Sequence, residues 1–423
     1  MHALSSGDWL TRLHTDVVNY ESDHFSLKDD LVELSKVSKA ETVHCTILSC
    51  ARILEVLVAD ALCDLATANV FANLETLQSL NLVSSANLNW MHSTRRTGND
   101  VRHVRRRVDP QEAELALLFT ERCLEWFFCR YHPNDRLRSI TTDEQPIGLC
   151  DSTALRAAVE AFDSSVFNPV AVADETLQSG ESVFANCAPL SGALAEELIN
   201  CDKFEPAERV LNWAEARFPD DLRILQLRGL YWRRSAKRPE HNGDLQRAIE
   251  HMEPLYRKYG NDDETIGIMA AMYKALWEKN ETDTDSLRKA HRAYRTGWKN
   301  GRKNNGYLGI NAATTALWLG QSEEAELMAA DVRDGIHRTM QLLILLYSDT
   351  HAVPCKLDFW VQLQLGEAHL LLGDLDKARQ TYIEAFEQNK EKAGAINSAI
   401  DQARKILEVL GLPDDTDKWR PAV

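Results

Sequence analysis

The feature that most constrains this chain is a pattern of small residues that recurs along its C-terminal half. The clearest copy consists of Leu365, Gly366, Gly373, Ala378, Tyr382 and Ala385. Small side chains at this spacing let two consecutive helices approach closely, because larger side chains would push them apart. Further copies are centred on Ala207, Ala248, Ala290 and Ala325. The pattern predicts a series of stacked helix pairs.

The spacing within these copies resembles that of tetratricopeptide repeats, whose helix pairs stack into a solenoid. The copies are irregularly placed, and those around Ala248 and Ala290 need an insertion between their two helices. One such copy is also typical of any amphipathic helix hairpin, but five copies in order are not. The resemblance implies a tetratricopeptide-like α-solenoid over residues 186–412, with a protein or peptide partner in its groove.

Two stretches inside this region point to a more specific resemblance. Tyr307 to Ala313 (YLGINAA) and Phe359 to Asp374 are similar to the TRAFs-binding region of certain mitogen-activated kinase kinase kinases and their bacterial relatives. The similarity spans about residues 200 to 410 and implies a docking or regulatory solenoid. The sequence contains no glycine-rich kinase loop, no H-R-D or D-F-G motif and no Walker A motif.

Composition excludes several other classes of protein. A length of 423 residues predicts two or three domains. Only 19 glycines and 12 prolines argue against a β-sandwich with many tight turns. The sequence has neither an apolar run long enough to cross a membrane nor the pattern of a secretory signal at its start. Nine cysteines without paired C-x-x-C clusters predict buried thiols in a cytoplasmic protein, with no metal or other cofactor.

The N-terminal part is predicted to be a separate helical bundle, so the whole chain is expected to be all-α. The segment from Val43 to Leu65 carries apolar residues on more than one face, which is typical of a helix buried among others. Asp109 and Pro110 form a helix-start signal ahead of an apolar-periodic segment. The expected domains are a bundle at 1–138, a linker with a short helix at 139–185, the solenoid at 186–412 and a tail at 413–423.

One segment of the bundle is rich in arginine. The net charge of −16 argues against indiscriminate binding of nucleic acid, yet six arginines and a single acid, Asp100, lie in this segment. The arginines are Arg95, Arg96, Arg102, Arg105, Arg106 and Arg107. A segment of this kind is typical either of a helix face in solvent or of a contact with an anionic partner.

The same segment contains residues suited to phosphodiester chemistry. In a helix, Asn99 and His103 lie one turn apart on one face, with Arg95 and Arg96 close to it. Histidine titrates near neutrality and can transfer protons, and arginine stabilises the charge on a phosphate. Metal-independent cleavage of RNA is therefore one hypothesis for the function of this site.

The pattern Arg95-x-x-Gly98-Asn99-x-x-x-His103 resembles that of a domain-of-unknown-function family grouped with the HEPN helical bundles. The resemblance covers about residues 35 to 130. It implies an endoribonuclease that acts as a homodimer, with a role in bacterial defence or toxin-type growth arrest. The residues it implies as catalytic are His103, Asn99, Arg95 and Arg96. The arginines then expected to bind RNA are Arg102, Arg105, Arg106 and Arg107.

Two functions remain compatible with the sequence. The first is a HEPN-type ribonuclease effector that is regulated by a protein-binding solenoid. The second is a non-catalytic adaptor, in which the bundle dimerises and the solenoid docks partner proteins. In the adaptor, His103 bonds to a neighbouring carbonyl, Asn99 caps a helix, and Arg95 and Arg96 pair with acids such as Glu55 or Asp60. Exposure of the His103 side chain separates the two hypotheses.

Overall fold

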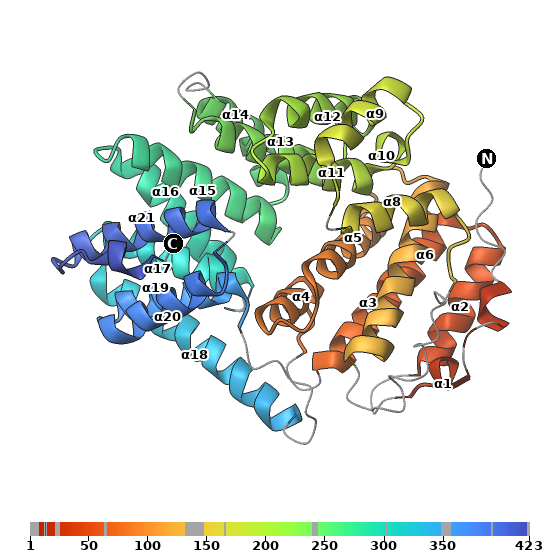
Figure 1. Cartoon of the computed structure of the whole chain (residues 1–423), viewed down its shortest axis with the longest axis horizontal. Helices are drawn as coiled ribbons and strands as arrows, with labels where there is room; N and C mark the ends of the chain where they lie inside the picture. Colours follow the sequence, from red (N-terminus) through yellow and green to blue (C-terminus); the bar gives the residue numbers. More distant parts are fainter. Residues whose placement is uncertain are drawn as a thin grey trace. The chain divides into compact units, whose positions relative to one another are not determined.

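The computed structural model of the chain describes residues 8–11, 13, 15–21, 26–62, 66–131, 148–164, 166–238, 244–301, 303, 305–347, 357–390 and 392–420. Among these residues every regular element is a helix, apart from an isolated bridge between Glu21 and Ser26. The predicted all-α class is confirmed (Figure 1). None of the helices in this part of the chain combines the length and the apolar character that crossing a bilayer needs.

The chain forms two compact units, which are described separately. The first consists of Met1–Gln78 and Leu82–Ser235, and the second of Ser79–Asn81 and Ala236–Val423. The predicted boundary between linker and solenoid, at residue 186, lies inside the first unit. The reason is that α11 (Ala188–Asn200) and α12 (Phe204–Arg217) pack against α9 (Pro169–Ser179) and α10 (Val183–Asn186).

The helix α3 (Val43–Leu62) lies at the centre of the N-terminal bundle. It packs against α2 (Leu27–Lys39), α5 (Ser85–Arg102) and α6 (Pro110–Glu125). Contacts with three neighbours require apolar residues on several faces, and α3 buries Ile47, Ile53, Leu54 and Leu57 completely or nearly so. The prediction of a buried helix in this segment is confirmed.

Local signals position the neighbouring helices. Asp109 caps α6 by accepting the backbone N–H of Glu112 at 3.1 Å, and Pro110 occupies the first helical position, as predicted. After α6 the chain continues as the π-helical turn η3 (Trp126–Tyr131). The other helices of the first unit are η1 (Asp8–Thr11), α1 (Thr15–Val18), α4 (Val70–Ser79), α8 (Thr153–Asp163) and α13 (Leu222–Ser235). The segment expected to be a linker therefore contains α8, α9 and α10 in its described part.

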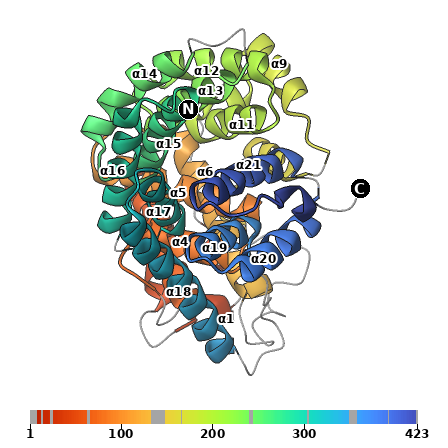
Figure 2. The same cartoon turned by 90° about the vertical axis from the view of Figure 1, so that its left-hand side faces the viewer.

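The second unit consists of helices that pack mainly against their neighbours in the chain (Figure 2). They are α14 (Asp244–Lys258), α15 (Asp263–Lys279), α16 (Thr284–Asn300), α17 (Gly306–Trp318), α18 (Ser322–Tyr347), α19 (Phe359–Leu371), α20 (Leu375–Glu387) and α21 (Ala393–Val409). The segment expected to be a tail contains η6 (Thr416–Trp419), whose Trp419 ring stacks on Tyr382 with ring centres 5.2 Å apart.

The repeated alanines lie where the pattern predicts them. Each belongs to an even-numbered helix from α12 to α20, and none is more than 1% exposed: Ala207, Ala248, Ala290, Ala325 and Ala378. Close approach is equally visible at Gly366 in α19, where an added Cβ would lie 3.0 Å from the Tyr382 ring of α20. Small residues at these positions therefore allow the helices to pack closely.

The expectation that the cysteine thiols are buried holds only in part. Cys50 is buried as predicted, but Cys45 is exposed, because it lies on the outer side of the first turns of α3. Among the tryptophans of the second unit, Trp277 and Trp298 are buried. In contrast, Trp360 is 50% exposed, because it lies in the first turn of α19 and points outward.

Candidate functional site

The residues predicted to be catalytic lie in the last turns of α5 and directly after it. The backbone N–H of His103, the C-cap residue, donates to the carbonyl of Asn99 at 2.9 Å, so these two residues are one turn apart. Arg96 precedes Asn99 by a further turn on the same face. His103 is exposed, whereas Arg96 and Asn99 are half-buried. The exposure on which a catalytic role of His103 depends is present, and the role itself stays a prediction.

Gly98 of the same motif has a packing role. A Cβ built on Gly98 would lie 2.6 Å from the Cβ of Ala51 on α3, which is closer than real side chains approach. The helices α3 and α5 can therefore pack at this point only because residue 98 has no side chain. Since Gly98 and Asn99 both lie inside α5, the alternative that Asn99 caps a helix is wrong; Ser84 caps α5.

The arginines of the segment point in different directions. The guanidinium of Arg95 lies over the Phe71 ring of α4, 5.1 Å from its centre. Arg102 pairs with Glu55 of α3 at 3.1 Å. Arg107 is exposed, and no carboxylate pairs with it in the part of the chain that the structure describes.

Arg105 and Arg106 turn back toward acidic residues. An Arg105 nitrogen lies 4.0 Å from Asp100. The Arg106 side chain is 7% exposed and contacts three carboxylates: Asp100 at 2.8 Å, Glu112 at 2.7 Å and Asp221 at 3.0 Å. Burial raises the pKa of Asp100 and of Glu112, and the positive charge of Arg106 opposes this rise. Arg106 therefore joins α5, α6 and the start of α13 inside the first unit, rather than facing a ligand.

In the second unit, residues from both stretches of the TRAFs-binding resemblance meet in a polar network. The Lys274 ammonium group donates to the side-chain oxygens of Asn311 at 3.3 Å and of Gln402 at 2.5 Å. The Gln402 amide donates to Glu367 at 2.6 Å, and the Thr314 hydroxyl donates to the same carboxylate oxygen. Burial raises the pKa of Glu367. The network connects α15, α17, α19 and α21.

The C-terminal helix α21 completes this network. It packs mainly against α17 and α19 rather than against α20, the helix that precedes it. Lys405 of α21 lies 2.5 Å from the Glu281 carboxylate and 4.1 Å from the centre of the Trp277 ring. Ile400 and Ile406 are fully buried beside it. The helix α21 therefore lies across odd-numbered helices of successive pairs and binds them through both apolar and polar side chains.

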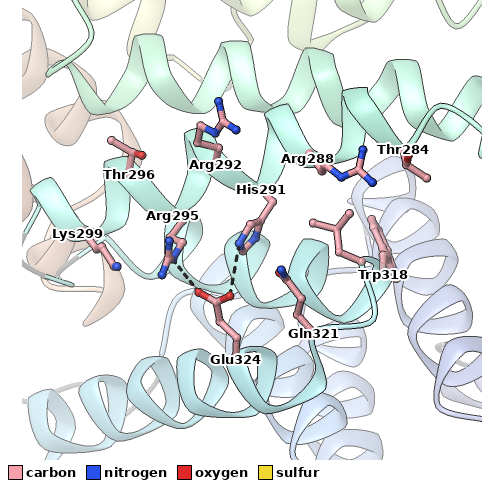
Figure 3. Close-up of a pocket in the computed structure, with 11 residues that line it drawn as sticks. Thr284, Arg288, His291, Arg292, Arg295, Thr296, Lys299, Trp318, Gln321 and Glu324 are labelled. Atoms are coloured by element: carbon pink, nitrogen blue, oxygen red, sulfur yellow. Dashed lines mark ion pairs between the residues drawn. The ribbon is translucent and has the colours of Figure 1, made fainter.

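A pocket of about 430 Å³ lies along α16 (Figure 3). Its cationic side chains are spaced by four, three and four residues, which places them on one side of the helix. They are Arg288, Arg292, Arg295 and Lys299. Among the described lining residues the acidic one is Glu324 of α18, which pairs with Arg295 at 2.7 Å and lies 3.9 Å from Nε2 of His291. We refer to this site as the α16 pocket.

His291 lines the α16 pocket, and a hydrogen bond fixes the orientation of its ring. Its Nδ1 atom lies 3.1 Å from the carbonyl oxygen of Ala312, which can only accept, so Nδ1 carries the proton. Burial lowers the pKa of His291. This pocket was not predicted from the sequence, although the spacing of the four cations on α16 was a signal that could have revealed it.

Comparison with known proteins supports tetratricopeptide-like repeats in the C-terminal region. Residues 202–316, which extend from α12 into α17, match the model of the Tetratricopeptide Repeats-Sensor family. The C-terminal region is tetratricopeptide-like. The matched residues include Asn311 and most of the α16 pocket, whereas the arginine-rich segment and Glu367 lie outside them. No curated protein matches the chain.

A solved structure with some likeness is the crystal structure of a thermophilic TPR protein from Thermus thermophilus. It has 18% sequence identity and a TM-score of 0.36, and the alignment covers 53% of this chain and all of that one. The tetratricopeptide-like character of the present chain rests on the family match and on the buried alanines.

Proposed function

We propose that the second unit is a protein-binding module whose docking face is covered by its own helix α21. The observation that carries this proposal is the position of α21 across α17 and α19. A face that holds one amphipathic helix through buried isoleucines, Gln402 and Lys405 has the chemistry to hold another. The tetratricopeptide-like character of the region and its resemblance to the TRAFs-binding region support a docking role.

The proposal predicts that α21 is exchangeable. A protease site placed between α20 and α21 allows the folded chain to be cut, which leaves the segment from Lys392 onward held only by noncovalent contacts. We expect a fluorescent peptide of the same sequence to replace the cut segment, as measured by anisotropy. A peptide with Ile400→Asp and Lys405→Glu should bind at least ~10-fold more weakly, because it loses a buried side chain and a charge pair.

The matched control is a peptide with Glu408→Gln, because Glu408 is exposed on the outer side of α21. It should bind like the natural sequence. If the cut segment cannot be replaced, or if the cut chain aggregates as soon as the segment leaves, α21 is an integral part of the core and the docking proposal is wrong.

A second candidate function is metal-independent RNA cleavage by the N-terminal bundle, and the exposure of His103 favours it. The resemblance to HEPN bundles supports roles for His103, Asn99 and Arg96, which follow one face of α5, and for the exposed Arg107 as an RNA contact. The same resemblance implies that two copies of the chain act together as a homodimer.

The test of this second candidate compares purified wild-type protein with two variants on labelled single-stranded RNA. His103→Ala should abolish cleavage, whereas His44→Ala, which alters another exposed histidine of the bundle, should leave it unchanged. Light scattering reports whether the active species is a dimer. The assay is repeated with the chain that has been cut between α20 and α21 and has taken up the peptide. If the RNA stays intact with every protein, the bundle does not have this function.

A further inference from the structure

The α16 pocket has an excess of positive charge that the described chain does not neutralise. Arg295 has Glu324 as its partner at 2.7 Å. For Arg288, Arg292 and Lys299, no carboxylate lies within ion-pair distance among the residues that the structure describes. Like charges one turn apart destabilise a helix, so this arrangement costs stability in the isolated protein.

Neighbouring cations on the same helix show that this excess is local to the pocket. Lys289 lies next to Arg288 in sequence but outside the pocket, and it pairs with Asp285 at 2.8 Å. Lys299 lies in the last turn of α16, where the helix dipole favours a cation. The dipole does not account for Arg288 and Arg292, because both lie in the middle turns.

The side chains that line the pocket point in different directions. Figure 3 shows His291 and Arg295 directed toward Glu324, Arg292 directed away from Glu324, and Arg288 directed toward Thr284. The hydroxyl of Thr284 and the amide of Gln321 add neutral hydrogen-bonding groups to the lining. A volume of about 430 Å³ falls within the range of sites for small molecules.

We propose that the α16 pocket binds a small ligand through an oligophosphate group. Arginine presents a planar set of donors that matches phosphate oxygens, and three of the four cations are arginines. Several adjacent cations suit an anion with several charges close together better than they suit a single carboxylate. Glu324 competes with an anionic ligand for Arg295, because its carboxylate already pairs with that arginine.

Calorimetric titration of the full chain with sodium tripolyphosphate tests the proposal, since this probe carries the phosphates alone. Binding with one site per chain is expected, with an affinity that falls as salt rises. Arg288→Gln with Arg292→Gln should weaken binding by about tenfold per arginine removed. Glu324→Gln should tighten it, because the competing carboxylate is neutralised. Circular dichroism checks that each variant is folded.

The control is Arg257→Gln with Arg338→Gln, because these arginines are exposed and lie outside the pocket. It should bind tripolyphosphate like the wild type. Adenosine triphosphate is the second probe. If it binds more tightly than tripolyphosphate, the pocket also recognises the organic part of the ligand. If the two affinities are equal, the pocket recognises the phosphates alone. Equal binding of citrate, no binding of either phosphate probe, or unchanged affinity in the Arg288 and Arg292 variant would each overturn the proposal.

Discussion

Gly98 and Arg106 belong to the arginine-rich segment that the sequence singles out for chemistry, yet both contribute to the packing of the first unit. Gly98 allows α5 to approach α3, and Arg106 pairs with three buried carboxylates. A motif on a helix thus combines residues with different tasks. The exposed His103 remains as the chemical candidate of the segment.

Replacing Gly98 with alanine tests the packing role. Alanine normally stabilises a helix relative to glycine by about 1 kcal/mol, but here its Cβ would clash with Ala51. Overpacking of this kind costs about 1–3 kcal/mol, so we expect net destabilisation in urea unfolding. The control is Gly335→Ala in α18, where an added Cβ meets nothing within 4 Å and should stabilise. Equal effects of the two substitutions would contradict this explanation.

Replacing Arg106 with methionine tests the ion cluster. The change keeps the volume but leaves Asp100, Glu112 and Asp221 without their shared cation. Removing one partner of a buried pair costs about 3–5 kcal/mol in the free energy of unfolding, as chemical denaturation would show. Arg107→Met alters the exposed neighbour and should change stability by less than ~0.5 kcal/mol. A small effect of Arg106→Met would mean that the cluster is solvated.

At the scale of helices, the sequence predicted where individual helices lie better than it predicted which helices pack against each other. Asp109 and Pro110 determine the start of α6 through local hydrogen bonding and backbone geometry, so a short sequence segment contains the necessary information. The repeated alanines likewise report contacts between helices that are adjacent in the chain. The docking of α21 on α17 and α19 has no local signal, because it joins helices that are distant in sequence.

The polar network beneath α21 gives a prediction about pH. Burial raises the pKa of Glu367 above its ordinary value of 4.5, so the folded state binds this proton more tightly than the unfolded state. Its contribution to stability is therefore complete below pH 4.5 and is lost as the pH rises through the folded-state pKa. Glu367→Gln keeps an oxygen acceptor but cannot titrate. We expect this variant to lose less stability than the wild type between pH 4.5 and neutrality.

The difference between the two proteins is measured by denaturation at several pH values. Glu408→Gln is the matched control, because Glu408 lies on the same docked helix but is exposed. Parallel pH profiles for Glu367→Gln and the wild type would show that the carboxyl is ionised in both the folded and the unfolded state.

At the scale of the molecule, the chain has two compact units, and each buries hydrophobic residues of its own. We therefore expect destabilisation to remain within one unit. In hydrogen exchange, Arg106→Met should reduce protection in described residues up to Ser235, and Glu367→Gln should change it only from Asp244 onward. Loss of protection across both units in either variant would show that they unfold together.

The sequence by itself determined the all-α class, the stacked helix pairs and the start of α6. These features depend on composition, on periodicity and on contacts between neighbouring elements, all of which are encoded locally. Only the tertiary structure decided which side chains are available. Arg106 pairs with Asp221, which is remote in sequence, and is therefore not available at the surface. The helix α21 covers α17 and α19, and the residue pattern of α21 does not specify these partners. Such pairings depend on the path of the whole chain, so no short segment contains them.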